Sequence, residues 1–341
     1  MKAWQKATFI IILILFVAAS VTISLVSISR PPYKYELQSI EDGDAVDGWA
    51  FYGFNGNAST KTLYIDFVRD KDGNVPDQSK PVLGVRKYAV NADEYIEEIV
   101  IGASVRYIDE YAFFNAKKLQ RITVDPANEF FKDVDGVLFT KDGKTLILYP
   151  VCYGQQPTGE TDKFTYPDAY VVPDGVERIN SFAFLKNGNL RDVTLPDTLK
   201  EIGDMAFFAC GRLGAYDYNA ENDTLEGTGF ILPDGLETIG SDAFSKCGSI
   251  APVIYLPASV KEIGHHAFFS CGGVKDVYLG AADETGLTTG DAWLPKSIKV
   301  GAVWKAPKPE YGKGRTDSET LTEAYKEETL NKLREEAKKN G

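Results

Sequence analysis

The chain has 341 residues, of which 44% are hydrophobic and 25% are charged, a balance that excludes wholesale disorder. Its formal net charge of −12 at pH 7 argues against a nucleic-acid-binding surface, because such surfaces are basic. An anionic membrane surface would repel the folded part of so acidic a chain for the same reason.

The N-terminal segment predicts export. Residues 7–29 contain no charged side chain, and at about 1.5 Å per helical residue this run can cross a hydrocarbon core of ~30 Å. Two interpretations remain open for residues 1–30. One is a retained signal anchor that uses the whole run, and the other is a signal peptide cleaved after Val17-Ala18-Ala19. Both place the repeats outside the cytoplasm, either membrane-anchored or secreted, at the cell surface.

The next stretch is predicted in two parts. Residues 31–48 are polar and acidic, which indicates a linker. Residues 49–84 are expected to form an N-terminal β-hairpin cap, with strands at 49–54 and 62–67 and a turn at Asn55-Gly56-Asn57. Such an aromatic hairpin could cover the first apolar layer of the repeats that follow.

Residues 85–303 carry an internal repeat. An Ala-Phe pair recurs at spacings as short as 23 residues, and a β-branched residue stands four positions before each alanine. The five clear copies place these residues in a common repeat core: Phe113, Phe184, Phe207, Phe244 and Phe268 with Ile108, Ile179, Ile202, Ile239 and Ile263. Insertions at about 125–171 and 219–231 interrupt the period. This periodicity is typical of a stacked solenoid, in which each unit buries its apolar residues against its neighbours.

Local signals predict a short helical turn and a short strand in each unit. The turn follows the phenylalanine and is closed by a glycine that tolerates the left-handed conformation: Gly188, Gly211, Gly248 and Gly272. The strand follows an apolar pattern, as in Leu119, Ile122 and Val124, whose last two side chains share one face. A proline then ends the strand in most units, because proline cannot donate to the ladder.

The phrase Leu-Pro-x-x-Leu-x-x-Ile-Gly-x-x-Ala-Phe-x-x-Cys, which runs from Leu195 to Cys210, resembles the BspA-type leucine-rich repeats of bacterial surface proteins. The resemblance covers most of the chain, from about residue 49 to about residue 299. It implies an α/β leucine-rich-repeat solenoid with short parallel strands and short helical turns, β-rich overall. It also implies adhesion or partner binding rather than catalysis. Asn180 and Asn187 depart from the pattern, because other units have glycine and cysteine there.

The four cysteines are interpreted first as structural. Cys210, Cys247 and Cys271 each lie three residues after a repeat phenylalanine, where free cysteine packs as a small hydrophobe. A disulfide between stacked units is the alternative, because exported cysteines can oxidise. A zinc site is disfavoured, because zinc motifs need ligands close together in the sequence. Cys152 lies in the first insertion and is predicted to be an exposed thiol.

No sequence motif assembles a catalytic, cofactor or metal site. The adjacent His265 and His266 are the only histidines, and neighbours on a helical turn do not face one another, so we interpret them as a solvated pair. Nucleophile-elbow, Walker, zincin and dinucleotide motifs are absent. We therefore expect a non-enzyme without cofactors, and a thiol enzyme using Cys152 is the remaining catalytic alternative.

The exposed face of the predicted parallel sheet is the candidate binding site. If Ile122 and Val124 point inward, the residues that alternate with them point outward, and solenoids use such extended faces for binding. The candidate residues are Glu98, Arg121, Thr123, Asp192, Thr194, Asp217, Tyr255, Asp276 and Tyr278. The end with the two tyrosines is favoured, because tyrosine supplies contact area at low entropy cost.

The chain is expected to close with a degraded unit in which Ala292-Trp293 replaces the Ala-Phe pair. A proline-containing linker over 304–317 and a helix over 318–341 are predicted to follow.

These features together predict an exported, membrane-tethered repeat protein that binds another macromolecule at the cell surface, as an adhesin or interaction scaffold. The partner is expected to be a protein or a glycan, and no nucleic-acid partner is expected. The alternative from another class is a structural component of the cell envelope without a specific ligand.

Overall fold

The computed structural model describes residues 33–42, 44–54, 60–70, 72–91, 93–114, 116–160, 163–215, 217–219, 224–226, 230–250, 253–274, 276–279, 286–294, 303–304 and 331. The predicted signal segment, residues 1–30, lies outside this set, as do the predicted C-terminal linker and helix apart from Trp304 and Asn331. Within the described set, no helix combines the length and the apolar character needed to cross a membrane.

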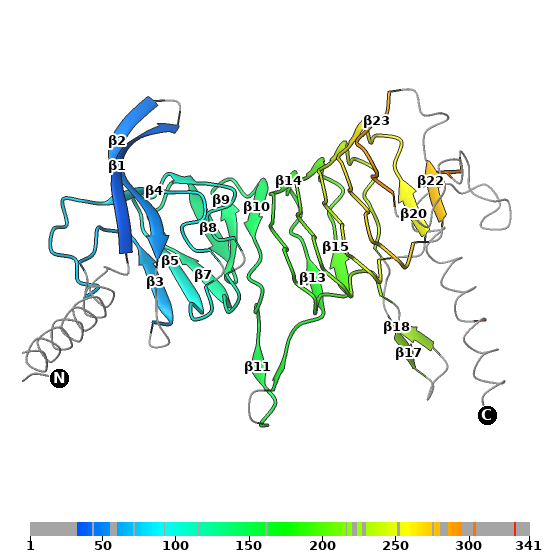
Figure 1. Cartoon of the computed structure of the whole chain (residues 1–341), viewed down its shortest axis with the longest axis horizontal. Helices are drawn as coiled ribbons and strands as arrows, with labels where there is room; N and C mark the ends of the chain where they lie inside the picture. Colours follow the sequence, from blue (N-terminus) through cyan, green and yellow to red (C-terminus); the bar gives the residue numbers. More distant parts are fainter. Residues whose placement is uncertain are drawn as a thin grey trace, which may run out of the picture.

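The repeats stack side by side as successive coils of a solenoid (Figure 1). One parallel ladder runs through short strands from consecutive coils: β10 (Thr145–Leu148), β14 (Arg178–Ile179), β16 (Glu201–Ile202), β19 (Thr238–Ile239), β21 (Glu262–Ile263) and β23 (Thr288–Thr289). Ile179, Ile202, Ile239 and Ile263 stand opposite one another in register and are fully buried. This row of isoleucines forms one wall of the core.

A second series of parallel strands is divided into three short sheets. They comprise β3 (Thr62–Ile65), β5 (Glu98–Ile101) and β7 (Arg121–Val124); β13 (Ala169–Val171) and β15 (Asp192–Thr194); and β20 (Val253–Leu256), β22 (Asp276–Leu279) and β24 (Val303–Trp304). Neighbouring strands in each sheet are parallel. The β-rich solenoid with parallel strands that the repeat predicts is therefore confirmed.

The helical turn that we predicted after each repeat phenylalanine is absent, since the described residues between 33 and 294 contain no helix. The N–H groups of Met205, Phe207 and Ala209 instead bond to carbonyls of the next coil at 2.8–2.9 Å. Met205 and Ala209 adopt the left-handed conformation, with φ of 52° and 61°. In a helix these N–H groups would bond to carbonyls of their own coil. The carbonyls of the next coil would then have no donor. The four glycines expected to be left-handed are not.

Four of the five repeat phenylalanines form a stack in the larger of two hydrophobic clusters: Phe184, Phe207, Phe244 and Phe268. Neighbouring ring centroids lie 4.7, 5.3 and 5.1 Å apart. Tyr149 continues the stack at 5.0 Å from Phe184, a position that the sequence analysis did not identify. Burying each such ring stabilises the fold by roughly 1.5–3 kcal/mol.

Phe113 lies in the smaller cluster, which corrects the prediction of one shared interior. That cluster belongs to the N-terminal coils, and Ile108 is only partly buried against it. The first insertion separates the two clusters along the chain. It forms the antiparallel strands β8 (Phe131–Val134) and β9 (Val137–Thr140), returns to the ladder at β10, and then projects outward as the hairpin of β11 (Gln156–Pro157) and β12 (Phe164–Thr165) (Figure 1).

The N-terminal region differs from both predictions made for it. β1 (Tyr33–Asp42) and β2 (Asp44–Phe54) pair in an antiparallel fashion, so the predicted linker over 31–48 was wrong. The predicted hairpin was also wrong, because its two strands, β2 and β3, pair with other strands. β2 pairs with β4 (Val82–Val85), and β4 pairs with β6 (Tyr107–Ile108). β3 pairs with β5. The alternation of Tyr33 and Tyr35 with polar residues is a strand signal that the acidic composition obscured.

The last coil is offset by one residue from our alignment. Thr289 pairs with Ile263. The N–H of Phe268 bonds to the carbonyl of Trp293 at 2.8 Å, as that of Phe244 does to the carbonyl of Ala267. Trp293 therefore occupies the alanine position of this coil, and the buried Leu294 takes the place of the phenylalanine.

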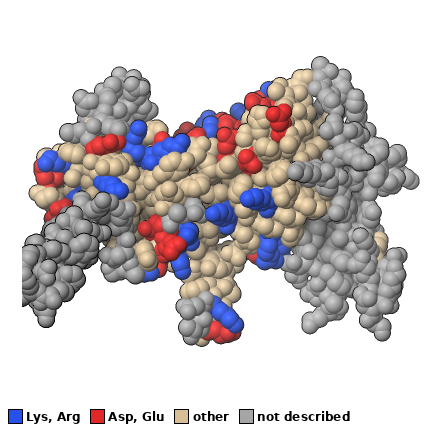
Figure 2. All heavy atoms as spheres, viewed as in Figure 1, with Lys and Arg blue, Asp and Glu red and all other residues tan. Residues whose placement is uncertain are grey.

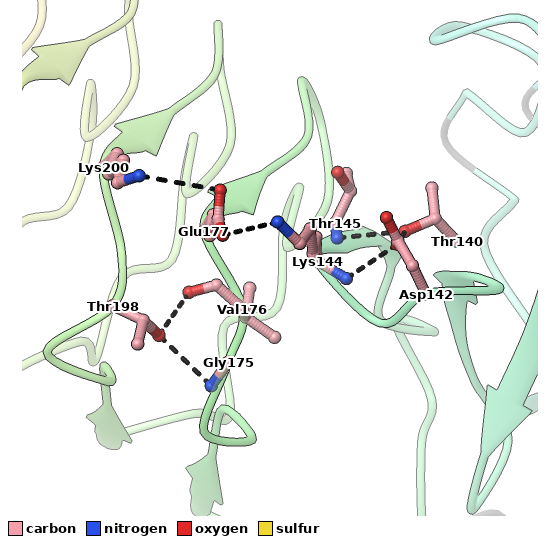
Figure 3. Close-up of polar contacts among 9 residues, drawn as sticks. All are labelled: Thr140, Asp142, Lys144, Thr145, Gly175, Val176, Glu177, Thr198 and Lys200. Atoms are coloured by element: carbon pink, nitrogen blue, oxygen red, sulfur yellow. Dashed lines mark hydrogen bonds and ion pairs between the residues drawn. The ribbon is translucent and has the colours of Figure 1, made fainter.

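Polar side chains link neighbouring coils beside the isoleucine row (Figure 3). The carboxylate of Glu177 lies 2.9 Å from Nζ of Lys144 on one side and 3.7 Å from Nζ of Lys200 on the other. The hydroxyl of Thr198 donates to the carbonyl of Val176 at 2.8 Å. These contacts hold the coils in register at the surface.

Candidate functional site

The outward face of β3, β5 and β7 brings three of the predicted binding residues together. The inward residues of these strands, such as Ile99 and Ile122, are fully buried, whereas the residues between them are partly or largely exposed. The strand register places two rows across this face, with Thr62, Glu98 and Arg121 in one and Tyr64, Val100 and Thr123 in the other.

Glu98 is the centre of the polar contacts on this face. Its carboxylate accepts a hydrogen bond from the hydroxyl of Thr123 at 2.9 Å and lies 3.3 Å from Nε of Arg121. The side chain of Arg121 is 61% exposed, and its two terminal amino groups have no partner among the described residues. A guanidinium in this state can bind a carboxylate or another pair of oxygens in a bidentate manner.

Tyr64 adds an exposed aromatic ring to the same face, and the sequence analysis missed it. The residue is 43% exposed, and the guanidinium of Arg69 lies 5.0 Å from the ring centroid. Both carboxylate oxygens of Asp66 bind that guanidinium at 2.8 Å, which fixes its position beside the ring. The signal was present in the alternation from Thr62 to Ile65, which matches that of β5, but we had assigned these residues to a hairpin.

Asp192 and Thr194 lie on β15, in the middle sheet. The carboxylate of Asp192 accepts from Nε of Arg191 at 3.0 Å, and Thr194 is exposed. On the adjacent strand, Val171 stands opposite Thr194 and is 67% exposed. This sheet therefore presents a smaller outward surface that is partly apolar.

Asp217 does not belong to the parallel sheet, which corrects its assignment to the binding face. It begins β17 (Asp217–Asn219), which pairs with β18 (Thr224–Glu226) in an antiparallel hairpin. The chain leaves the solenoid here because the second insertion starts at this strand and not after it.

At the C-terminal end, the register aligns the two favoured tyrosines. Tyr255 stands opposite Tyr278, and Tyr278 stands opposite Trp304 on the next strand. Asp276 stands opposite Val253 in the same sheet. Tyr255 is half-buried between the buried residues Ile254 and Leu256.

The cysteines have the properties of core residues. All four are free and buried, so Cys152 is not the exposed thiol that we predicted. Burial raises the pKa of the Cys152 thiol, whereas a cysteine nucleophile needs a lowered pKa. The thiols of Cys210, Cys247 and Cys271 lie 2.9–3.0 Å from the carbonyl oxygen of the phenylalanine in the preceding coil and donate to it.

The histidines do not form a common site. His265 is exposed, and its Nδ1 accepts the N–H of Asp291 at 2.9 Å. The ring of His266 contacts that of Phe269, with centroids 5.3 Å apart. Among the described residues, no three His, Cys, Asp or Glu side chains are placed to share a metal ion.

Acidic and basic side chains are interspersed over the described surface that Figure 2 shows. Neighbouring opposite charges on successive coils, such as Lys261 and Glu237, account for part of this mixing. Local contacts, and not a broad field of one sign, therefore distinguish one part of that surface from another.

A model of the BspA type leucine-rich repeat region matches this chain in six copies, over residues 84–139, 168–230 and 217–285. Together these ranges include about half of the 341 residues. No curated protein matches the chain.

Several solved structures resemble the chain. A leucine-rich repeat protein from Eubacterium ventriosum is 20% identical with a TM-score of 0.45, and the match covers 66% of this chain and 54% of that one, so this chain spans about half of that protein. The pneumococcal vaccine antigen PcpA is 18% identical with a TM-score of 0.41, and 87% of this chain and 95% of that one are covered. A leucine-rich cell surface protein from Faecalibacterium prausnitzii is 19% identical with a TM-score of 0.45, over 74% and 64% of the two chains.

Proposed function

The chain belongs to the BspA-type leucine-rich repeat family, and we propose that it is a non-catalytic protein of the cell surface that binds another macromolecule through the outward face of β3, β5 and β7. The apolar run over residues 7–29 supports export and tethering to the membrane. The partner is a protein or a glycan.

The observation that carries this proposal is the arrangement of Tyr64, Glu98 and Arg121 on one rigid sheet. Tyr64 offers an exposed ring that loses little side-chain entropy on binding, because tyrosine has few rotatable bonds. Beside it, Glu98 and Arg121 offer a carboxylate and a guanidinium with unfilled hydrogen-bonding capacity. An aromatic platform with polar groups at its edge suits either a sugar ring or a protein side chain.

The surface also has the rigidity that specific binding needs. The strands are held from below by buried residues such as Leu63 and Ile99, and the Arg69 guanidinium is fixed by Asp66. A preorganised surface loses less conformational entropy when a partner binds, so more of the contact energy appears as affinity.

A screen of the full-length protein on arrays of glycans, matrix proteins and surface proteins would identify the partner. With that partner, Tyr64→Ala should weaken binding by about tenfold or more, as expected for an aromatic anchor. Tyr52→Ala is the matched control, since Tyr52 is 42% exposed but lies on β2. Equal effects of the two substitutions, or the absence of any ligand on the arrays, would favour a purely structural envelope component.

The surface location has its own test. Protease added to intact cells should cleave the repeats if they are exported. Complete protection of the repeats in intact cells, with cleavage after lysis, would contradict the proposed location.

A further inference from the structure

The two rows of side chains on the outward face of β3, β5 and β7 carry no net charge. Glu98 and Arg121 are the charged members of these rows, and they contact each other at 3.3 Å. The remaining members are neutral: Thr62, Tyr64, Val100 and Thr123. A charged group of a partner would be attracted by one of the two charges and repelled by the other. This face therefore favours a neutral ligand.

Glu98 and Arg121 place a free acceptor beside free donors. The Glu98 carboxylate uses the same oxygen, Oε1, for its contacts with the hydroxyl of Thr123 and with Nε of Arg121. Its other oxygen, Oε2, accepts no hydrogen bond from any residue that the structure describes. Two adjacent hydroxyls of a sugar match this arrangement, because one donates to Oε2 while its neighbour accepts from a terminal amino group of Arg121.

The ring of Tyr64 has one face left for a ligand. The guanidinium of Arg69 lies over the ring, 5.0 Å from its centroid. Hydrogen bonds to Asp66 and to the carbonyl of Gly73 hold that guanidinium in place. Because Tyr64 is still 43% exposed, its opposite face meets solvent. The C–H groups of a sugar are slightly positive and pack favourably on the negative face of an aromatic ring.

The size of the face suits two linked sugar rings. β3, β5 and β7 lie side by side (Figure 1), and at a strand spacing of about 4.8 Å the face is roughly 10 Å across. Val100 lies next to Tyr64 in the same row and is half-buried. A sugar whose hydroxyls are all equatorial presents C–H groups on both faces and directs its hydroxyls sideways. It can therefore lie on Tyr64 and Val100 while the hydroxyls of the next ring reach Glu98.

We propose that the outward face of β3, β5 and β7 binds a neutral oligosaccharide of glucose-like residues with equatorial hydroxyls, an inference that rests on the proposed function. One sugar ring stacks on the free face of Tyr64. Two adjacent hydroxyls of the next ring bind Oε2 of Glu98 and the terminal amino groups of Arg121. The hydroxyl oxygen of Thr123, whose proton is donated to Glu98, accepts a hydrogen bond from a further hydroxyl.

Isothermal titration calorimetry of the full-length protein with cellohexaose and maltohexaose tests this assignment. Both are neutral glucose chains, and they differ in linkage, so at least one should bind saturably. Tyr64→Ala should weaken that binding about tenfold, whereas Tyr64→Phe should not, because phenylalanine keeps the ring. Tyr52→Ala is the matched control on β2, and thermal melts would establish that the variants are folded.

A second variant tests the role of charge. Glu98→Gln leaves the charge of Arg121 uncompensated, so it should weaken binding of the neutral chain and strengthen binding of tetragalacturonic acid. The ratio of the two affinities should shift about tenfold toward the acidic sugar. Glu97→Gln is the control, since Glu97 pairs with Lys61 outside the two rows and its loss should leave the ratio unchanged.

Binding of neither hexaose would overturn the inference. So would tighter binding of tetragalacturonic acid than of both hexaoses by the unmodified protein, or equal effects of Tyr64→Ala and Tyr52→Ala on hexaose binding. If a protein bound through Tyr64 while neither hexaose did, the sugar assignment would be wrong and the proposed function would stand. If no ligand of either class bound, both would fail.

Discussion

The rings of Phe184 and Phe207 lie 4.7 Å apart and within 6° of parallel. Each comes from the same position of two consecutive coils, so their separation reports the rise of the solenoid at its core. The stack continues at nearly the same spacing through Phe244 and Phe268. Every interior ring therefore has two neighbouring rings, and its removal opens a gap in a continuous row.

Truncation of Phe207 should destabilise the protein strongly. Phe207 is fully buried and stacks on rings from both neighbouring coils. Phe207→Ala should lower the free energy of unfolding by roughly 3–5 kcal/mol, through lost apolar burial and the cavity that remains. Urea unfolding followed by circular dichroism would measure it. Phe208→Ala is the control, since Phe208 is only partly buried and its ring contacts Lys246. Equal losses for the two variants would contradict the packing described here.

The glycine after the buried isoleucine should resist substitution. A Cβ on Gly264 would lie 2.3 Å from the backbone nitrogen of Ser241 in the preceding coil, and a Cβ on Gly240 would meet Gly203 and Asp204 in the same way. Gly264→Ala should therefore separate the coils and lower the thermal midpoint. Gly248→Ala is the matched control, because a Cβ there meets nothing within 4 Å and Gly248 has no positive φ. A Gly264→Ala protein as stable as Gly248→Ala would contradict this close approach.

The same close approach explains a departure from the repeat. Asn180 stands where other coils have this glycine, and its N–H still bonds to the carbonyl of Leu146 at 2.9 Å. Beyond Leu146 the preceding coil leaves the regular path, so a side chain has room. Asn187 likewise replaces the cysteine, and its Nδ2 lies 3.5 Å from the carbonyl of Tyr149, where the cysteines donate to a phenylalanine carbonyl.

The repeat positions could be predicted because stacking imposes the same environment on each copy. Phe207, Ile202 and Cys210 meet their equivalents in the next coil, so their spacing in the sequence reports contacts in space. The conformation of the turn could not be predicted in this way. The N–H groups of the turn bond alternately to carbonyls of the same coil and of the next coil. Residues such as Met205 adopt a left-handed conformation, which cannot be predicted from the identity of a residue other than glycine.

The candidate binding face was only partly predictable. Alternation within a strand identified Glu98, Arg121 and Thr123 as outward residues, but which strands lie side by side depends on tertiary pairing. Tyr64 was missed because β3 pairs with β5, a parallel partner more than 30 residues away, and not with the nearer β2. Asp217 was misplaced because the insertion that contains it leaves the sheet at that residue.

The alternating charges beside the isoleucine row should stabilise the protein by holding neighbouring coils in register. Glu177 lies between Lys144 and Lys200 (Figure 3), and the next coils continue the alternation with Glu237 and Lys261. Glu177→Lys would place three ammonium groups in succession. It should lower the thermal midpoint more than Glu177→Gln does, though far less than Phe207→Ala. Added salt should reduce the difference between the two Glu177 variants, and a difference that does not respond to salt would exclude an electrostatic origin.

The buried cysteines predict a loss of stability at alkaline pH. Burial raises the pKa of Cys210 to about 12 from its ordinary value of 9.0, and it raises that of Cys271 to about 12 as well. Between these two values the unfolded chain releases thiol protons that the folded protein retains. The free energy of unfolding is therefore unaffected below pH 9 and falls as the pH rises toward 12, in total by on the order of 4 kcal/mol for Cys210.

Comparison with Cys210→Val isolates this effect, because valine has a similar size and no proton to lose. The variant should lose some stability near neutral pH, since the hydrogen bond from the thiol to the carbonyl of Phe184 is removed. Its stability should then fall less steeply than that of the unmodified protein, so that at about pH 11 the difference between the two has shifted by roughly 2–3 kcal/mol in favour of the variant. Buried tyrosines such as Tyr149, whose pKa burial also raises, titrate in both proteins and cancel in this difference. Urea unfolding at a series of pH values would measure both curves, and parallel curves would show that the Cys210 thiol ionises in the folded state as easily as in the unfolded chain.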